Sequence, residues 1–240
     1  MLGAPFLKQV RLDPQKVDPD AFPFNTVPYL AGDFALGFDR AITILVGENG
    51  AGKSTLIEAI AQAAGFSAQG GSQDHRTGGF DAGNGLARAL RLSWLPRVQR
   101  GFFFRAESFF NVIGYLDRHD SAGDLQRRSH GEAFLETFRD RMQTRDRAIY
   151  ILDEPEVALS PQRQLAFLRI LREWQLSGQV QAIIATHSPI LMHLPDAALL
   201  SLDGGEIRPV RPDETEHVRI TRGFLANPAG VLADLFEDLG

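Results

Sequence analysis

The sequence predicts an α/β fold in which a mainly parallel sheet is covered by helices on both faces. Three short apolar segments, 41–47, 148–152 and 182–185, are each followed by helical signals. Continuous apolar runs of this length are typical of strands buried between two layers of helices. Strands that alternate with helices along the chain indicate a parallel sheet.

Helices are expected after each of these strands. Apolar residues at helical spacing follow the first strand, at Leu56, Ile57, Ile60, Ala61 and Ala64. A Ser–Pro pair combines an N-cap with proline at the first helical position. Two such pairs predict helices that begin at Ser160, ending near residue 175, and at Ser188. An amphipathic helix is expected over 132–145.

The remaining segments have less regular patterns. Residues 65–85 are rich in Gly, Ser and Asp and predict a long loop. Residues 101–110 predict a strand that runs into a turn. Residues 199–210 predict a hairpin that turns at Asp203-Gly204-Gly205.

The composition excludes several classes of protein. The hydrophobic fraction of 44% allows a sizeable core. No apolar run is long enough to span a membrane, and the N-terminus has too short an apolar stretch for a secretion signal, so a cytoplasmic location is expected. A net charge of -5 argues against broad, non-specific nucleic-acid binding.

The segment after the first strand predicts a phosphate-binding loop. It fits G-x-x-x-x-G-K-[ST] and is followed by Thr55; its residues are Gly47, Glu48, Asn49, Gly50, Ala51, Gly52, Lys53 and Ser54. Glycines allow backbone N–H groups to converge on phosphate oxygens at a helix N-terminus. Lys53 is expected on the β- and γ-phosphates, and the Ser54 hydroxyl on Mg²⁺.

Two carboxylates and a histidine end the other two buried strands. Asp153 is expected to hold the metal, and Glu154 is expected to be the general base that activates a water. Ligands bind at the carboxyl ends of parallel strands, so His187, after the third strand, is expected to contact the γ-phosphate.

The segment from Arg128 to Leu135 contains a fourth candidate motif. Ser129 and Glu132 form a capping box for a helix. The same Ser129, with Gly131 and the helix N-terminus, also makes an anion site. The two interpretations are compatible, because one helix tip can serve as both.

The order of these motifs resembles that of the ATP-binding cassette (ABC) ATPases. Ser129, Gly131 and Glu132 resemble the signature motif with departures, and Ala158-Leu159-Ser160 resembles the D-loop, so Ser160 is an expected nucleotide contact. The Q-loop has no clean match. Glu107 is the better candidate for that metal contact, and Gln99 the weaker one.

This resemblance implies an ABC-type head that binds ATP and Mg²⁺. It implies one domain over 1–240, with an N-terminal antiparallel β part and a helical lobe inserted at roughly 84–145. It also implies a head-to-tail homodimer, in which Ser129 contacts ATP held by the partner's Lys53, acting as a switch on a protein partner. The motifs look most similar to the soluble branch of chromosome-maintenance, repair and OLD-type ATPases, in its small stand-alone form.

Two other functions stay open at this stage. One is a DNA-acting repair or phage-defence module, for which several arginines are a candidate basic patch (Arg97, Arg100, Arg105, Arg127 and Arg128). The other is the nucleotide-binding subunit of an ABC transporter. The residue that contacts adenine also stays open, with Phe22, Phe24 and Phe34 as candidates.

Overall fold

The structure, a computed structural model, describes residues 3–67, 70, 85–105 and 146–237. Its largest element is a sheet with the strand order β5-β6-β7-β3-β8-β9. The strands are β3 (Ile42–Val46), β5 (Gly101–Arg105), β6 (Ala148–Asp153), β7 (Val180–Ala185), β8 (Ala198–Ser201) and β9 (Arg208–Pro209). Only β9, the second strand of the expected hairpin, pairs antiparallel within this described sheet. The predicted parallel sheet and the hairpin are both confirmed.

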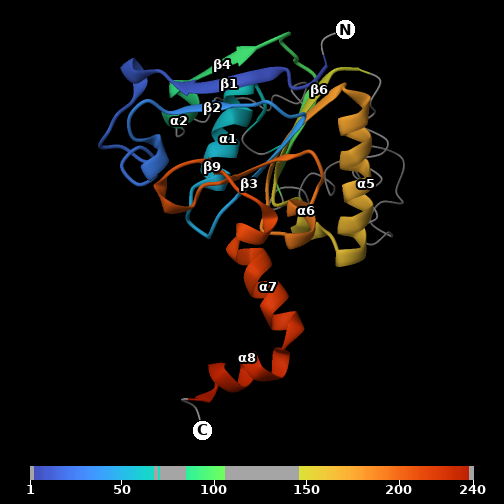
Figure 1. Cartoon of the computed structure of the whole chain (residues 1–240). Coiled ribbons are helices and arrows are strands. Elements are labelled where there is room, and N and C mark those ends of the chain that lie inside the picture. Colours follow the sequence, from blue (N-terminus) through green and yellow to red (C-terminus); the bar gives the residue numbers. More distant parts are fainter. Residues whose placement is uncertain (1–2, 68–69, 71–84, 106–145, 238–240) are drawn as a thin grey trace, which may run out of the picture.

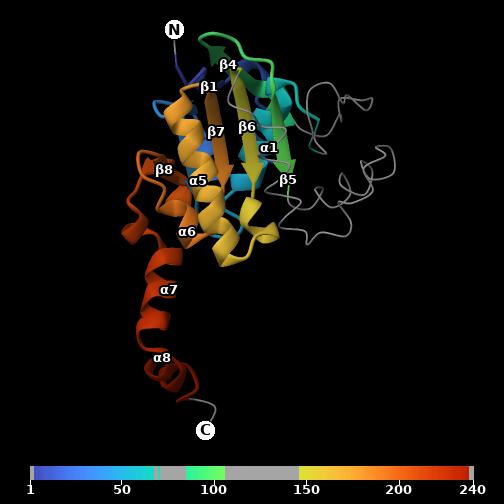
Figure 2. The same cartoon turned by 90° about the vertical axis from the view of Figure 1, so that its right-hand side faces the viewer.

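Helices cover both faces of the sheet (Figures 1 and 2). Helix α1 (Lys53–Ala64) packs on one face, and α5 (Pro161–Ser177) with the short α6 (Pro189–Met192) packs on the other. Every residue of β3, β6 and β7 is buried, as expected for strands between two layers. The sheet is therefore a rigid base from which loops at one edge can present side chains.

A smaller antiparallel sheet confirms the expected N-terminal β part. Its order is β2-β1-β4, from β2 (Ala35–Gly37), β1 (Leu7–Leu12) and β4 (Leu90–Trp94). The sheet and α2 (Gly85–Ala89) share a core with α1. The amide of Gln181, which is fully buried in β7, accepts hydrogen bonds from the N–H groups of Phe6 and Leu7 at 2.8 and 2.7 Å. This polar contact fixes the start of β1 against the main sheet.

The structure bears on three further expectations. β4 belongs to the antiparallel sheet and β5 to the main sheet, so both strands fall inside the range expected for the inserted lobe, whose bounds stay a prediction. Ser160 occupies the N-cap position before α5 as expected, although its side chain makes no capping hydrogen bond. Ser188 caps α6 as expected, accepting from the N–H of Leu191 at 3.2 Å, and α6 has four residues. The expected helix over 132–145 lies outside the described residues.

The C-terminal segment forms two helices that the sequence analysis did not anticipate. Helices α7 (Glu216–Ala226) and α8 (Pro228–Leu235) extend away from the body, at the end where the strands of the main sheet terminate (Figures 1 and 2). Val218 is the only buried residue of this arm, residues 216–235, within the described chain. No helix in the described ranges is both long and apolar enough to cross a membrane.

Candidate nucleotide-binding site

The loop between β3 and α1 has the backbone shape that its glycines predict. Gly50 and Gly52 have φ of 84° and 85°, a left-handed region that favours glycine. A Cβ on Gly52 would lie 2.7 Å from the hydroxyl oxygen of Tyr29. That hydroxyl donates to the carbonyl of Gly52 at 2.7 Å. Tyr29 therefore supports the loop where it enters α1, and nothing in its local sequence singled it out.

Lys53 turns its ammonium group back into this loop. Its Nζ donates to the carbonyl oxygens of Gly47 at 2.7 Å and Glu48 at 2.9 Å, and the residue is only 5% exposed. Burial lowers the pKa of Lys53, although carboxylates around it, Glu154 foremost, act in the opposite direction. The cation thus sits inside the concave loop, where an anionic ligand would meet it directly.

Ser54 and Asp153 meet although they are far apart in sequence. The hydroxyl of Ser54 donates to Oδ1 of Asp153 at 3.0 Å. Asp153 is 7% exposed, and burial raises its pKa to about 6. A hydroxyl and a carboxylate are oxygen donors of the type that Mg²⁺ takes in phosphate sites, where it uses one or two carboxylates plus waters and phosphate oxygens.

This donor set fits Mg²⁺ better than a metal held by protein alone. In the described part of the chain, no group of three or more His, Cys, Asp or Glu side chains is arranged to hold a metal ion. Ser54 and Asp153 would therefore hold a metal that the substrate's phosphates complete. Glu107, the third expected metal ligand, lies outside the described residues.

Glu154 is held in a strained conformation at the end of β6. It has φ of 51° and ψ of 54°, an uncommon backbone state for a residue other than glycine. Its N–H donates to the carbonyl of Ala185 on β7 at 2.9 Å, which ties the residue to the neighbouring strand. Its Oε1 lies 3.6 Å from Nε2 of His187. The candidate base and the candidate γ-phosphate contact therefore face the same space.

His187 is fixed by its backbone and by its ring. Its N–H donates to Oε1 of Glu156 at 2.6 Å, and its ring Nδ1 lies 2.8 Å from Nε2 of His217 on α7. Burial and the nearby Lys53 ammonium lower the pKa of His187 to about 4. The imidazole is therefore neutral near pH 7.

Strand register explains why these side chains converge. Leu45 on β3 and Asp153 on β6 both pair with Ala185 on β7. The three strands are parallel neighbours, so the residues that follow each of them lie at the same edge of the sheet. Lys53, Ser54, Asp153, Glu154 and His187 meet there.

Asp203, which follows β8, also reaches this edge. Its Oδ1 accepts from the N–H of Glu48 at 2.8 Å, and its Oδ2 accepts from the hydroxyl of Ser201 at 3.0 Å. A Cβ on Gly47 would come within 2.9 Å of Asp203 Oδ1, so the close approach needs glycine. The sequence analysis placed Asp203 only in a turn. Its position after the next strand of an α/β sheet is the signal that could have found it.

Among the remaining candidates, Ser160 is exposed at the start of α5. Gln99 precedes β5, which runs parallel to β6, so Gln99 lies at the opposite edge of the sheet from Asp153. Ser129, Gly131 and Glu132 are outside the described residues. Asn49, Ala51 and Thr55 lie in or just after the loop, as expected from their positions.

The three described candidate arginines do not gather into one patch. Arg97 and Arg100 precede β5, whereas Arg105 ends it, so they lie at opposite edges of the sheet. Arg100 pairs with Asp146, and Arg105 pairs with Glu58 at 3.3 Å. Arg127 and Arg128 lie outside the described residues. The predicted basic patch is therefore not formed by Arg97, Arg100 and Arg105.

The adenine candidates differ in exposure. Phe34 is buried in the core at 7% exposure, and Phe24 packs against the same core. Phe22 is 65% exposed. In the segment that leads to Tyr29, Phe22 is therefore the candidate with a ring available for stacking.

Comparisons with known proteins give the wider context. A family profile described as "AAA domain, putative AbiEii toxin, Type IV TA system" matches residues 42–122 and 133–193, which is more than half of the chain. The matched residues include the phosphate loop, Asp153, Glu154 and His187, whereas Ser129 to Glu132 fall between the two matched segments. A search of curated proteins found no significant match.

Two solved structures are similar to this chain at low identity. An Smc head bound to the C-winged helix domain of ScpA has 14% identity and a TM-score of 0.50, covering 86% of this chain and 97% of that chain. The SMC head domain from Thermotoga maritima has 18% identity and a TM-score of 0.45, covering 86% of this chain and 100% of that one. At 14% identity, the likeness to the Smc head bound to the ScpA domain concerns the fold alone.

Proposed function

We propose that this chain, which belongs to the AAA_21 family of AAA domains, is a Mg²⁺-dependent ATPase that works as a nucleotide-driven switch. The observation that carries the proposal is the meeting of Lys53, the Ser54–Asp153 pair, Glu154 and His187 at one edge of the sheet. Cation, metal ligands, base and phosphate contact are the parts that phosphoryl transfer to water requires.

Each side chain has a separate task in this reaction. The backbone N–H groups of the loop and Lys53 would hold the β- and γ-phosphates. Ser54 and Asp153 would hold Mg²⁺, which supplies neutralising charge on the phosphates. Glu154 would orient a water and accept its proton, as its carboxylate projects into the space that it shares with the His187 ring. His187 would donate a hydrogen bond to the γ-phosphate from Nε2.

The switch part of the proposal rests on the resemblance to ABC-type heads. Two copies would stack head to tail, so that Ser129, Gly131 and Glu132 of one copy complete the site of the other. Hydrolysis would separate the copies, and a protein partner in the cytoplasm would sense the change. The described site is consistent with this arrangement, because it lies at the open edge of the sheet rather than in the core.

Replacing the candidate base Glu154 by the corresponding amide tests the proposed ATP hydrolysis. Glu154→Gln keeps shape but cannot accept a proton, so phosphate release should fall by about 10²–10⁴. ATP affinity should stay within a few-fold of wild type, and ATP should now convert the variant to a stable dimer. Phosphate release, calorimetry and light scattering measure the three quantities.

Two controls define the result. Glu173→Gln changes an exposed carboxylate on α5 and should leave all three quantities unchanged. Lys53→Ala removes a charge-assisted contact and should weaken ATP binding itself. Wild-type protein that neither binds ATP nor releases phosphate with Mg²⁺ would disprove the proposed function. A monomeric Glu154→Gln variant at saturating ATP would disprove only its dimer part.

A further inference from the structure

His217, in the first turn of α7, contacts the candidate γ-phosphate sensor. Its Nε2 lies 2.8 Å from Nδ1 of His187, and the two ring centroids are 4.9 Å apart. The contact joins a helix near the C-terminus to the end of β7. No part of the sequence pattern around His217 suggested a role in the site.

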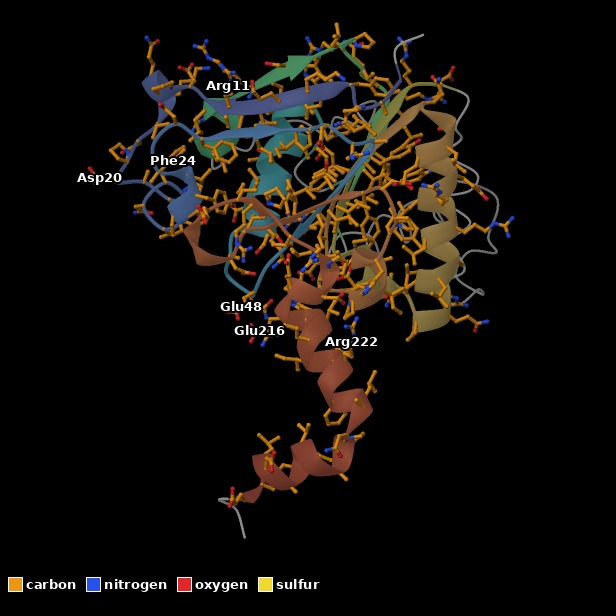
Figure 3. The ribbon with its side chains drawn as sticks, viewed as in Figure 1. Arg11, Asp20, Phe24, Glu48, Glu216 and Arg222 are labelled. Atoms are coloured by element: carbon orange, nitrogen blue, oxygen red, sulfur yellow. The ribbon has the colours of Figure 1, made fainter. Side chains whose placement is uncertain are left out.

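The first turn of α7 is held firmly against the body. Thr215 accepts from the N–H of Val218 at 3.4 Å and donates to the carbonyl of Pro212 at 2.7 Å. Val218 itself is buried at 3% exposure. Glu216, the first residue of α7, lies beside Glu48 of the phosphate loop (Figure 3), and their hydrogen bond raises the pKa of Glu48. The Thr215 cap and the buried Val218 side chain fix the position of His217 at the start of α7.

The hydrogen bond between the two rings allows two proton arrangements, because either nitrogen can be the donor. A neutral imidazole has one N–H donor and one acceptor nitrogen. Oε1 of Glu154 faces Nε2 of His187 at 3.6 Å, and its negative charge favours the proton on that nitrogen. Nδ1 is then the acceptor, so His217 must donate from its Nε2.

We propose that His217 is a positioning residue that holds His187 in its Nε2–H tautomer and fixes the ring plane. This deepens the proposed function and rests on it, because only the Nε2–H tautomer of a neutral His187 can donate to a phosphate oxygen. The opposite tautomer would present a lone pair to the phosphate and repel it.

This role also links the arm to the nucleotide. Beyond Val218, no residue of α7 or α8 is buried in the described structure. Among the described contacts, those that anchor the arm to the body therefore lie mainly at the turn that carries His217. A change at the γ-phosphate that moves the His187 ring would therefore alter the contact with His217 and displace the first turn of α7.

A pair of substitutions of equal length separates donation from packing. In His217→Gln the amide keeps an N–H donor near the original Nε2, whereas His217→Met fills a similar volume with no donor. We expect His217→Met to lower kcat at least about tenfold and to leave ATP affinity within about twofold, because ring orientation matters in the reaction more than in binding. His217→Gln should stay within a few-fold of wild type. His193→Met, at an exposed histidine after α6, is the matched control and should be unchanged.

A second readout does not depend on hydrolysis. Nitrogen NMR of ¹⁵N-histidine-labelled protein, assigned with His187→Gln, reports which nitrogen of His187 is protonated. We expect a protonated Nε2 and a bare Nδ1 in wild type and His217→Gln, and a mixture of tautomers in His217→Met. A protonated Nδ1 in wild type would overturn the proposal, and so would unchanged kcat and tautomer in His217→Met. If wild type shows the expected tautomer but no ATPase activity, the proposed function fails and the positioning contact stands.

Discussion

At the scale of single residues, the site contains a buried carboxylate, that of Asp153. Asp153 is 7% exposed, and its only side-chain hydrogen bond in the described structure comes from Ser54. Burial disfavours its charged form more than that one bond favours it, and the pKa rises from 3.8 to about 6. A residue selected for stability alone would not be placed this way. Holding a divalent cation is a function that would compensate the cost.

Asp153→Asn should therefore stabilise the protein when metal and nucleotide are absent. With a raised pKa, the native state binds more protons than the unfolded state between about pH 4 and 6, so the free energy of unfolding falls as pH rises through that window. The variant lacks this dependence. It should exceed wild type by roughly 1–3 kcal/mol at pH 7 and match it below about pH 4.

Urea unfolding at both pH values measures this difference. Asp20→Asn, at an exposed aspartate, is the control and should show no such pH-dependent gain. Equal stability of Asp153→Asn and wild type at pH 7 would mean that the buried carboxylate is not penalised. ATPase activity should be lost in Asp153→Asn whatever its stability, because an amide is a poor ligand for Mg²⁺.

At the scale of elements, the phosphate loop is shaped from two sides. Tyr29 holds the carbonyl of Gly52 at the start of α1, and Asp203 holds the N–H of Glu48 at the end of β3. Both partners come from segments distant in sequence. The loop thus has a fixed shape before any ligand arrives, which lowers the entropy cost of binding.

Asp203→Ala should weaken ATP binding without removing any group that touches ATP. Losing the hydrogen bond from the N–H of Glu48 frees the first turn of the loop, and we expect affinity to fall about tenfold. Asp203→Asn keeps an acceptor for the same N–H and should bind nearly as well as wild type. Asp213→Ala, which removes only the partner of Arg222 near the arm, serves as control. Calorimetry that shows equal affinity for Asp203→Ala and Asp203→Asn would contradict this anchoring role.

At the scale of the whole molecule, the site faces outward at the edge of the sheet and lies beside the arm. In the proposed dimer each site takes Glu154 from one copy and Ser129 from the other. Because the two residues of one site come from different copies, two inactive variants can together form an intact site. Mixing the two variants tests this expectation.

A mixture of Ser129→Arg and Glu154→Gln should recover activity. Each variant alone should be inactive, because one places a bulky cation at the partner's γ-phosphate and the other lacks the base. A mixed dimer has one site with both defects and one site with neither. Random pairing makes about half of the dimers mixed, so at most roughly a quarter of all sites should be intact.

Phosphate release after subunit exchange measures this recovery against each variant alone. Recovery supports Ser129 acting in the partner's site. If mixed dimers form and no activity returns, Ser129 acts within its own copy or the two sites must fire together. Full activity of Ser129→Arg alone would leave the segment from Ser129 to Glu132 as no more than a helix cap.

Much of the site could be predicted from local sequence. The apolar strands, the glycine pattern ending at Lys53 and Ser54, the Asp153-Glu154 pair and His187 are each short-range signals. Their meeting at one edge also follows, because parallel strands place their carboxyl ends together. The family match and the shared fold agree with the predicted fold class. The signal for the hairpin formed by β8 and β9 was also local, because its turn residues are consecutive in the sequence.

The supports of the site were decided only by the tertiary structure. Tyr29, Asp203 and His217 reach it through contacts across 23, 155 and 30 residues of sequence. No local pattern marks them, because an isolated tyrosine, aspartate or histidine looks the same whether its side chain meets water or a backbone group. The sequence by itself determined which groups could do the chemistry, since periodicity and turn residues act over a few positions. Which groups hold them in place was determined by strand order and helix packing, which bring distant segments within hydrogen-bonding distance.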